Sequence, residues 1–272
     1  MKSDKEVLIF LQEHLKKEEA AKMKEKKEEF IAVITGGASG IGFAIAKKFV
    51  QNKIKSVLIG RNVTKLKLAC ETLGDLADFI VCDLTKIGEL PGLVQNIRDK
   101  HGKIDILVNN AGIHLKKPFT DVTDADYQKV ILTNQTAMFC LSREVVAVMK
   151  TQQKGVVLNI SSMAPKHGIS NDIAFTASKS AIEGMTRNMA VELAGFGIRV
   201  NCIAPGFIKT NISSLALDKD PELKRKVLSR TPLRRLGKPG EVADAALFLV
   251  LDSASYITGV ILPVDGGNSI GF

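Results

Sequence analysis

Short apolar runs rich in β-branched residues alternate with amphipathic stretches from residue 31 to the end of the chain. The runs occupy residues 31–35, 56–60, 78–83, 104–110, 155–162, 198–206 and 260–267, and the helical stretches between them include 41–51, 86–101, 124–150, 175–195 and 239–251. Continuous apolar strands that alternate with helices are typical of βαβ units, in which both faces of a parallel sheet are buried. Because the crossovers of such units are right-handed, the sequence predicts an α/β fold with a doubly wound, Rossmann-type parallel sheet of about seven strands.

Length and cysteine content agree with one domain of this kind. The chain has 272 residues, 45% hydrophobic and 25% charged, which is an ordinary globular balance. A domain of this size buries a large core without covalent cross-links. The four cysteines are widely spaced and lie in apolar runs, which indicates buried free thiols and not disulfides or a metal site. They are Cys70, Cys82, Cys140 and Cys202.

Residues 1–30 differ from the predicted domain, which spans residues 31–272. The apolar stretch V-L-I-F-L at 7–11 is followed by helix-forming residues, and in this segment eight lysines balance eight acidic residues. We expect a solvated helical extension. The alternative is an apolar face that packs on the domain or on a neighbouring subunit, formed by Val7, Leu8, Phe10, Leu11 and Leu15.

The charge and the chain termini narrow the expected partners. The net charge of +9 belongs to the body of the protein and favours an anionic ligand, such as a phosphorylated cofactor or an acidic substrate. No basic run is interleaved with aromatic residues, so no nucleic-acid partner is expected. No apolar stretch is long enough to span a membrane, and M-K-S-D-K-E does not open a secretory signal. We therefore expect a cytoplasmic protein with no membrane partner.

A glycine-rich segment, T-G-G-A-S-G-I-G at 35–42, joins the first predicted strand to the first predicted helix. Gly36 permits a tight turn, while Gly40 and Gly42 allow the backbone to approach a pyrophosphate and the helix to pack on the strand. The free N–H groups at the helix N-terminus attract the phosphates. Strand, loop and helix occur in the required order, so the segment predicts a dinucleotide site.

The end of the second predicted strand indicates which dinucleotide binds. An acidic residue there hydrogen-bonds the ribose diol of NAD, whereas a basic residue accommodates the 2′-phosphate of NADP. Gly60 occupies the usual acidic position and Arg61 follows it, which favours NADP(H). The alternative is that Arg61 is only a surface cation. Asp83 ends the third predicted strand, where it is expected to contact the adenine, and N-N-A-G at 109–112 is expected to lie against the adenosine half.

Several motifs occur in a characteristic order: T-G-x-x-x-G-I-G, N-N-A-G, an Asn in the next helix, N-I-S-S, a Y-x-x-x-K-like frame and P-G-F-I-x-T. Over residues 30–270 the chain resembles the classical short-chain dehydrogenase/reductase family. T-P-L-x-R-L-G-K-P at 231–239 and the V-D-G-G end resemble its 3-oxoacyl-acyl-carrier-protein reductase and sugar dehydrogenase branches, which share these motifs.

The resemblance implies hydride transfer at a nicotinamide, assisted by a Ser-Tyr-Lys-Asn proton machinery. The matching residues are Asn134, Ser162 and Lys179, and the tyrosine position holds Phe175. The segment P-G-F-I-K-T at 205–210 is expected to border the nicotinamide. The cofactor residues implied are Thr35, Gly36, Ser39, Gly40, Ile41, Gly42, Arg61, Asp83, Leu84, Asn110, Ala111, Gly112, Lys179, Pro205, Gly206, Ile208 and Thr210.

Phe175 leaves three interpretations open, because phenylalanine keeps the ring but has no hydroxyl to donate. The chain is a Tyr-to-Phe variant of an active reductase, or a natural non-catalytic protein that binds NADP(H) as a sensor or scaffold. The third interpretation is an enzyme that uses another acid, such as a water relay or His167. Loss of a positioned general acid lowers the rate by roughly 10²–10⁴-fold.

Substrate and assembly are less constrained. Candidate substrate residues are His114, Lys166, His167 and Phe207. With Lys116, Lys117, Lys209, Arg230, Arg234 and Arg235 they make a basic rim, which favours a sugar acid, keto acid or acyl thioester, although a solvated surface explains these cations equally well. The resemblance also implies a homotetramer, assembled through the helices expected at 126–150 and 175–195.

Overall fold

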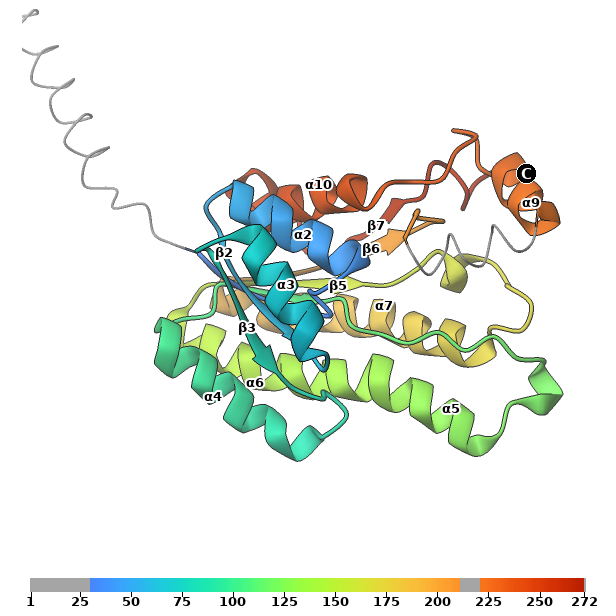
Figure 1. The fold of residues 1–272 in the computed structure, drawn as a ribbon. Helices are drawn as coiled ribbons and strands as arrows, with labels where there is room; N and C mark the ends of the chain where they lie inside the picture. Colours follow the sequence, from blue (N-terminus) through green and yellow to red (C-terminus); the bar gives the residue numbers. More distant parts are fainter. Residues whose placement is uncertain (1–29, 211–220, 272) are drawn as a thin grey trace, which may run out of the picture.

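The computed structural model describes residues 30–210 and 221–271, so nearly all of the predicted N-terminal extension lies outside the described residues. Seven strands form one parallel sheet with the order β3-β2-β1-β4-β5-β6-β7 (Figure 1). The strands are β1 Ile31–Thr35, β2 Lys55–Gly60, β3 Ala77–Val81, β4 Ile106–Asn109, β5 Gly155–Ile160, β6 Ile198–Pro205 and β7 Ile261–Val264. The predicted doubly wound sheet is confirmed.

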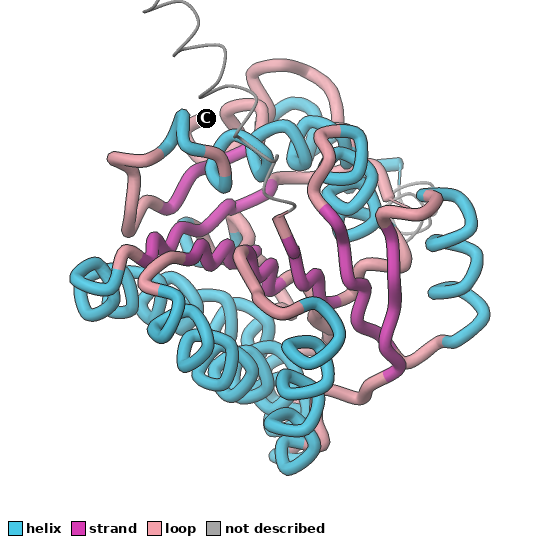
Figure 2. The backbone as a smooth tube through the Cα atoms, turned by 90° about the vertical axis from the view of Figure 1, so that its left-hand side faces the viewer, coloured by secondary structure: helices cyan, strands magenta, loops and turns pink. Residues whose placement is uncertain are grey.

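Helices cover both faces of the sheet, as the alternation in the sequence requires (Figures 1 and 2). One face carries α2 (Gly40–Gln51), α3 (Val63–Leu73) and α10 (Pro239–Val250), and the other carries α4 (Leu90–His101), α5 (Asp124–Ile131), α6 (Ala137–Gln152) and α7 (Ile173–Leu193). Successive side chains of a strand point to opposite faces. Thus Ile31 and Val33 of β1 join one core cluster, whereas Ala32 and Ile34 join the other.

The sheet order fixes where a ligand binds. The chain leaves β1 toward β2 on one side and leaves β4 toward β5 on the other, so the loops that follow β1 and β4 diverge. In open α/β sheets a crevice forms at this switch point, outside the carboxyl ends of the strands. Both glycine-containing motifs, at 35–42 and 109–112, follow these two strands.

Three helical regions differ from the expectation. Helix α3 was not predicted, and the Asn62 side chain caps its N-terminus by accepting a hydrogen bond from the Lys65 amide at 2.9 Å. The helix expected at 86–101 begins with a 3₁₀ turn at Ile87–Glu89. The helix expected at 124–150 contains a π-helical turn at Leu132–Thr136, between α5 and α6. A short further helix, α9 (Pro221–Arg230), precedes the T-P-L segment.

The cysteines are free, and burial matches the prediction for Cys82, Cys140 and Cys202. Cys70 is an exception, because it lies on α3 and is only partly buried. None of the helices in the described ranges is long and apolar enough to cross a membrane.

Candidate active site

The glycine-rich loop packs tightly against its neighbours, and two of its glycines make this packing possible. Gly36 has a left-handed backbone, with φ of 64°, and its amide donates to the Ile59 carbonyl at 2.8 Å. A Cβ atom on Gly42 would overlap the Gly36 carbonyl oxygen and come within 2.5 Å of Asn110 Nδ2. A side chain at residue 42 would therefore force the start of α2 away from the loop.

The N-N-A-G segment is hydrogen-bonded directly to this loop. Thr35 Oγ1 accepts from the amides of Asn110 at 2.9 Å and Ala111 at 3.0 Å, and it donates to the Val108 carbonyl at 3.2 Å. Asn110 Nδ2 donates to the Thr35 carbonyl at 2.9 Å. These contacts fix the two walls of the crevice relative to each other.

The N-terminus of α2 has the properties of an anion site. Ser39 is the N-cap residue, but its side chain caps no amide, and the first turn contains no acidic residue. Thr210 lies beside this turn, since a Cβ on Gly40 would be 3.7 Å from Thr210 Cγ2. The first amides of a helix point outward and carry partial positive charge, so this end can hold a phosphate.

The 205–210 segment is held in place by Gly237. The Lys209 amide donates to the Gly237 carbonyl at 2.7 Å, and the Gly237 amide donates to the Phe207 carbonyl at 2.9 Å. Ile208 is buried between them. The preceding Gly206 amide donates to the Val264 carbonyl at 3.0 Å, which joins the segment to β7.

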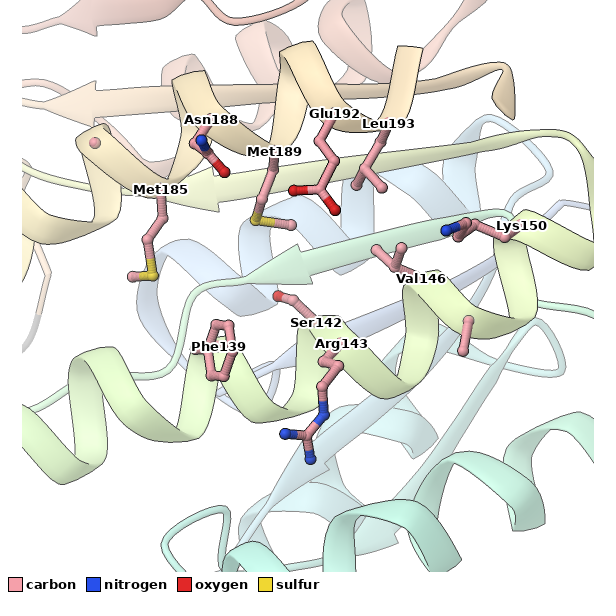
Figure 3. Close-up of a pocket in the computed structure, with 12 residues that line it drawn as sticks. Phe139, Ser142, Arg143, Val146, Lys150, Met185, Asn188, Met189, Glu192 and Leu193 are labelled. Atoms are coloured by element: carbon pink, nitrogen blue, oxygen red, sulfur yellow. The ribbon is translucent and has the colours of Figure 1, made fainter. Parts of the chain in front are cut away.

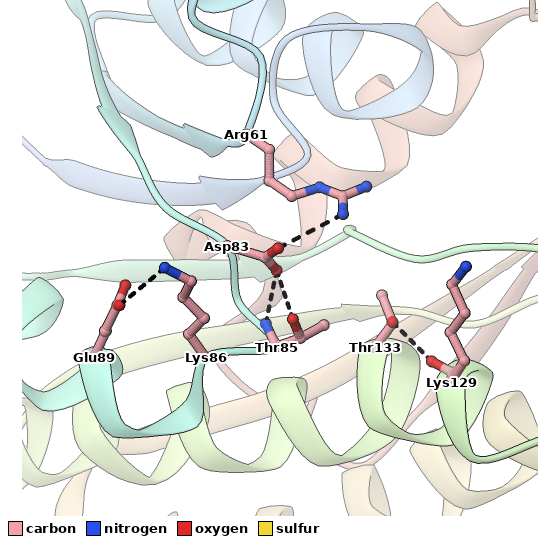
Figure 4. Close-up of polar contacts among 7 residues, drawn as sticks. All are labelled: Arg61, Asp83, Thr85, Lys86, Glu89, Lys129 and Thr133. Carbon is pink, nitrogen blue, oxygen red and sulfur yellow. Dashed lines mark hydrogen bonds and ion pairs between the residues drawn. The ribbon is translucent and has the colours of Figure 1, made fainter. Parts of the chain in front are cut away.

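A cleft of about 610 Å³ opens at the carboxyl ends of β1 to β4. Its lining includes Gly36, Gly60, Arg61, Asp83, Leu84, Ala111, Gly112 and His114. Arg61 Nη1 lies 3.7 Å from Asp83 Oδ2 across the cleft mouth (Figure 4). The pKa of Asp83 is lowered, first by the Thr85 hydroxyl and amide and then by Arg61. The Arg61 side chain is 69% exposed, so its guanidinium remains accessible to a ligand.

Phe175 and Lys179 lie one turn apart on α7 and therefore on the same helix face. Lys179 Nζ is 5.6 Å from the centre of the Phe175 ring and donates to the Ile160 carbonyl at 2.8 Å. Burial lowers the pKa of Lys179 to about 8, because the apolar surroundings disfavour the ammonium form. The frame of the predicted Tyr-x-x-x-Lys motif is thus intact apart from the hydroxyl.

Asn134 lies in the π-helical turn and connects three segments. Its Oδ1 accepts from the Ile113 amide at 2.8 Å, and its Nδ2 donates to the Ile113 carbonyl at 2.9 Å and to Ser178 Oγ at 3.1 Å. Ser178 in turn donates to the Phe175 carbonyl at 2.7 Å. Asn134 therefore links the loop after β4 to the helix that carries Phe175.

Ser162 follows β5, two residues after the carbonyl that Lys179 binds. Its Oγ accepts from the Ala164 amide at 3.2 Å and it is only partly buried. The adjacent Ser161 is buried, and its hydroxyl donates to Glu183 Oε1 at 3.1 Å. Of the two serines, Ser162 is the accessible one.

The candidate substrate residues separate into different environments. His114 packs edge-on against Phe175, with ring centroids 4.7 Å apart. The charges that act on His167 are those of Arg230 and Asp265, and its pKa is lowered by burial. Among the rim cations, Lys117 pairs with Asp126 at 2.7 Å and Arg235 pairs with Glu241 at 2.8 Å.

These pairs reduce the free positive charge that the sequence suggested for the rim. Phe207 follows β6 and lies in the segment bound to Gly237. The pKa of Asp265 is lowered against the effect of burial, first by hydrogen bonds from Ser269 and Gly267 and then by the charge of Lys166. In the described ranges no group of three or more His, Cys, Asp or Glu side chains is arranged to hold a metal ion.

Comparison with known proteins agrees with this geometry. Residues 36–269 match the family model described as enoyl-(acyl carrier protein) reductase. The chain belongs to the short-chain dehydrogenase/reductase family. Members of this oxidoreductase family use a nicotinamide cofactor, so the resemblance predicted from the motifs is confirmed.

Individual relatives extend over nearly the whole domain. A 3alpha-hydroxysteroid dehydrogenase of Mediterraneibacter gnavus is 38% identical over 87% of this chain and 95% of its own length. The 3-oxoacyl-(acyl-carrier-protein) reductase FabG of Thermotoga maritima is 39% identical over 87% of this chain and 96% of its own. The structure of actinorhodin polyketide ketoreductase with NADPH matches with a TM-score of 0.85 and 27% identity, covering 90% of this chain and 99% of that one.

Proposed function

We propose that this short-chain dehydrogenase/reductase transfers a hydride between NADP(H) and a carbonyl or secondary alcohol. The observation that carries the proposal is the convergence of Lys179, Asn134 and Gly112 beside Phe175, next to the cleft of the cofactor. A Cβ on Gly112 would lie 3.2 Å from Asn134 Oδ1 and 3.6 Å from Lys179 Nζ. The missing side chain at Gly112 thus keeps this part of the cleft open.

The residues present fit a dinucleotide. Gly36 makes a left-handed turn and Gly42 lets α2 pack close against it, while Gly40 has open space beside it for a pyrophosphate. The first amides of α2, which the Ser39 side chain does not cap, would face this group. Asp83 and Leu84 would border the adenine, and Ile208 and Thr210 would hold the carboxamide end. When bound, the nicotinamide supplies or accepts the hydride.

NADP(H) is favoured over NAD(H) by the end of β2. No carboxylate at Gly60 would repel a 2′-phosphate, and the exposed Arg61 guanidinium can bind its oxygens in a charge-assisted manner. The ketoreductase of similar fold was solved with NADPH, which supports this choice. The nearby Asp83 keeps Arg61 over the cleft mouth by a weak ion pair.

The proton machinery is proposed to act on the carbonyl oxygen. Ser162 hydrogen-bonds that oxygen and stabilises the charge that develops on it. Lys179 contributes positive electrostatic potential near the same oxygen. Asn134 binds Ser178 on α7, the helix that carries Lys179. Phe175 cannot donate a proton, so we propose that turnover is strongly impaired relative to a tyrosine at this position.

A non-catalytic NADP(H)-binding sensor or scaffold is the second candidate, and Phe175 is the observation that favours it. The two functions differ in one respect. A reductase regains turnover when the hydroxyl is restored, whereas a sensor binds NADPH equally well with either residue at position 175.

The substrate class is proposed from charge and from the relatives. Lys166 and His167 favour an anionic group, and the relatives include enzymes named for a hydroxysteroid and for 3-oxoacyl-acyl-carrier-protein. We propose a test panel of cyclohexanone, acetoacetate, galacturonate, acetoacetyl-CoA and a 3-oxosteroid. The four free cysteines fit a reducing compartment, so cytoplasm remains our proposal for its location.

Phe175→Tyr tests the function directly. NADPH absorbance would be followed with each member of the panel for the parent and for Phe175→Tyr. We expect at least about a hundredfold gain in kcat for one substrate, as for a regained general acid. Equal NADPH binding without turnover by either protein would instead support the sensor.

The surface between α6 and α7 supports the proposed homotetramer. It contains a hollow of about 560 Å³ whose apolar lining includes Phe139, Val146, Met185 and Met189 (Figure 3). Phe139 is 48% exposed in the single chain. These are the two helices expected from the sequence to form an interface, and we propose that a second copy of the chain covers this face.

A further inference from the structure

The ring environment of Phe175 contains an ionisable group that the family motif does not include. Lys179 Nζ is 5.6 Å from the Phe175 ring centre, and the His114 ring centre is 4.7 Å from it at an interplanar angle of 88°. His114 also lines the cofactor cleft. An ionisable ring is therefore in contact with the side chain that stands in place of the tyrosine.

A buried carboxylate lies against this histidine. His114 Nε2 lies 2.7 Å from Oδ1 of Asp172, whose side chain is only 3% exposed. Among the described residues this oxygen has no aligned hydrogen bond, from His114 included, so the contact is one of charge between the carboxylate and the imidazolium form.

The local backbone is built to support this contact. Asp172 is the N-cap residue of α7, a position where aspartate normally accepts from the helix amides, yet its side chain makes no cap hydrogen bond. The preceding Asn171 has a left-handed backbone, with φ of 66°, and its carbonyl accepts from the Lys117 amide at 2.8 Å. The loops after β4 and before α7 are therefore fastened together at two points.

We propose that His114, paired with Asp172, is the proton donor to the carbonyl oxygen in this chain, in place of the absent tyrosine hydroxyl. The proposal rests on the proposed reductase function. It replaces His167, which the sequence had suggested as an alternative acid and which the structure surrounds with Arg230 and Asp265.

Proton transfer from His114 would use the ring nitrogen other than Nε2. Because Nε2 lies beside the Asp172 carboxylate, the Nδ1–H of the imidazolium is the proton available for transfer. If a bound nicotinamide delivered hydride to the carbonyl carbon, the C=O π pair would move to oxygen and take this proton. The Nδ1–H bond breaks, an O–H bond forms and neutral imidazole remains. The His114 side chain is 46% exposed, so water reprotonates it.

Nitrogen-15 NMR of the histidine rings gives a readout that is independent of turnover. The chain has four histidines, and the His114→Gln spectrum identifies the signals of His114. Asp172→Asn should change the nitrogen-15 chemical shifts of the His114 ring, because an anion 2.7 Å from Nε2 is removed. Unchanged His114 chemical shifts in Asp172→Asn would overturn the pairing of the two residues.

Measuring kcat with either Phe or Tyr at position 175 distinguishes proton donation by His114 from a packing role of its side chain. His114→Gln should lower kcat at least about tenfold in the parent but less than about twofold in the Phe175→Tyr background, where tyrosine donates. His101→Gln is the matched control, since His101 Nε2 also lies 3.4 Å from a carboxylate, that of Asp78, but at the end of α4. It should leave kcat unchanged.

The remaining outcomes have distinct meanings. Three results would overturn His114 as the donor and leave the reductase function standing. These are an equal loss of kcat from His114→Gln in both backgrounds, no loss of kcat in the parent, and an inactive parent beside an active Phe175→Tyr protein. If Phe175→Tyr turns over no member of the panel, the reductase function fails, and the donor assignment falls with it.

Discussion

Cofactor selectivity should depend on Arg61. Its guanidinium is 69% exposed and is held by Asp83 only at 3.7 Å, so little interaction with the protein is lost when it turns to a 2′-phosphate. A hydrogen bond to a charged group contributes about 1.5–3 kcal/mol, and loss of the Asp83 pair and solvent screening reduce this to about 1–2 kcal/mol. Arg61→Ala should therefore weaken NADPH binding about 5- to 30-fold.

NADH provides the internal reference for this measurement, because it lacks the 2′-phosphate. Its dissociation constant should change less than about twofold in Arg61→Ala. Binding is measured by the fluorescence of the reduced nicotinamide, which is simple to interpret since the chain contains no tryptophan. Lys86→Ala removes an equal charge nearby, but Lys86 pairs with Glu89 at 3.2 Å outside the cleft and should change neither constant (Figure 4).

Gly60→Asp tests the same reasoning in the opposite direction. A Cβ at this residue would meet Leu66 at 3.6 Å, which is an ordinary contact, so the aspartate fits without strain. Its carboxylate would repel the 2′-phosphate and bind the ribose diol, which should convert the preference to NADH. Equal weakening of NADPH and NADH by Arg61→Ala would refute the assignment of Arg61 to the phosphate.

Three further outcomes follow from burial and packing. The unfolded chain binds more protons than the folded one between pH 8 and about 10.4, because Lys179 has a folded pKa of about 8. The free energy of unfolding of the parent, measured by urea titration relative to that of Lys179→Met, should therefore rise by about 3 kcal/mol from the lower to the upper end of that pH window. Gly42→Ala should lower stability by about 1–3 kcal/mol and abolish NADPH binding, whereas Gly88→Ala, with no atom within 4 Å, should do neither. Phe139→Glu should dissociate the assembly in sedimentation experiments, and Leu68→Glu, also an exposed apolar position but on α3, should not.

The sheet and the cofactor loop were predictable from local sequence. Strands buried on both faces read as continuous apolar runs, as in I-A-V-I-T at 31–35, and the glycines at 36 and 42 are required by backbone geometry. Helix α3 was predictable in principle, because Asn62 precedes it as a cap and Gly74 follows it. The N-cap residue Asn62 is visible in the sequence, but the helical pattern after it is weaker than the apolar strand patterns at 56–60 and 78–83 on either side.

The contact of His114 with Asp172 could not be predicted from the sequence. It depends on two loops, far apart in the chain, that meet because α7 packs against α5 and the π-helical turn that follow the first loop. It also depends on a side chain that leaves its usual capping role. The π-helical turn around Asn134 is similar, since its hydrogen bonds go to Ile113 and Ser178 and not to sequence neighbours. Tertiary contacts decide such features, and local propensity does not.

The strand order has a consequence for synthesis of the chain. β1 lies between β2 and β4, and Thr35 hydrogen-bonds Asn110, which is 75 residues later. At about 5–20 residues per second, a ribosome needs about 4–15 s to add that stretch. During this interval one edge of β1 has no partner strand and the crevice has only one wall. A nascent chain that ends before β4 therefore has no complete dinucleotide site, and the cofactor can stabilise only chains that have passed this point.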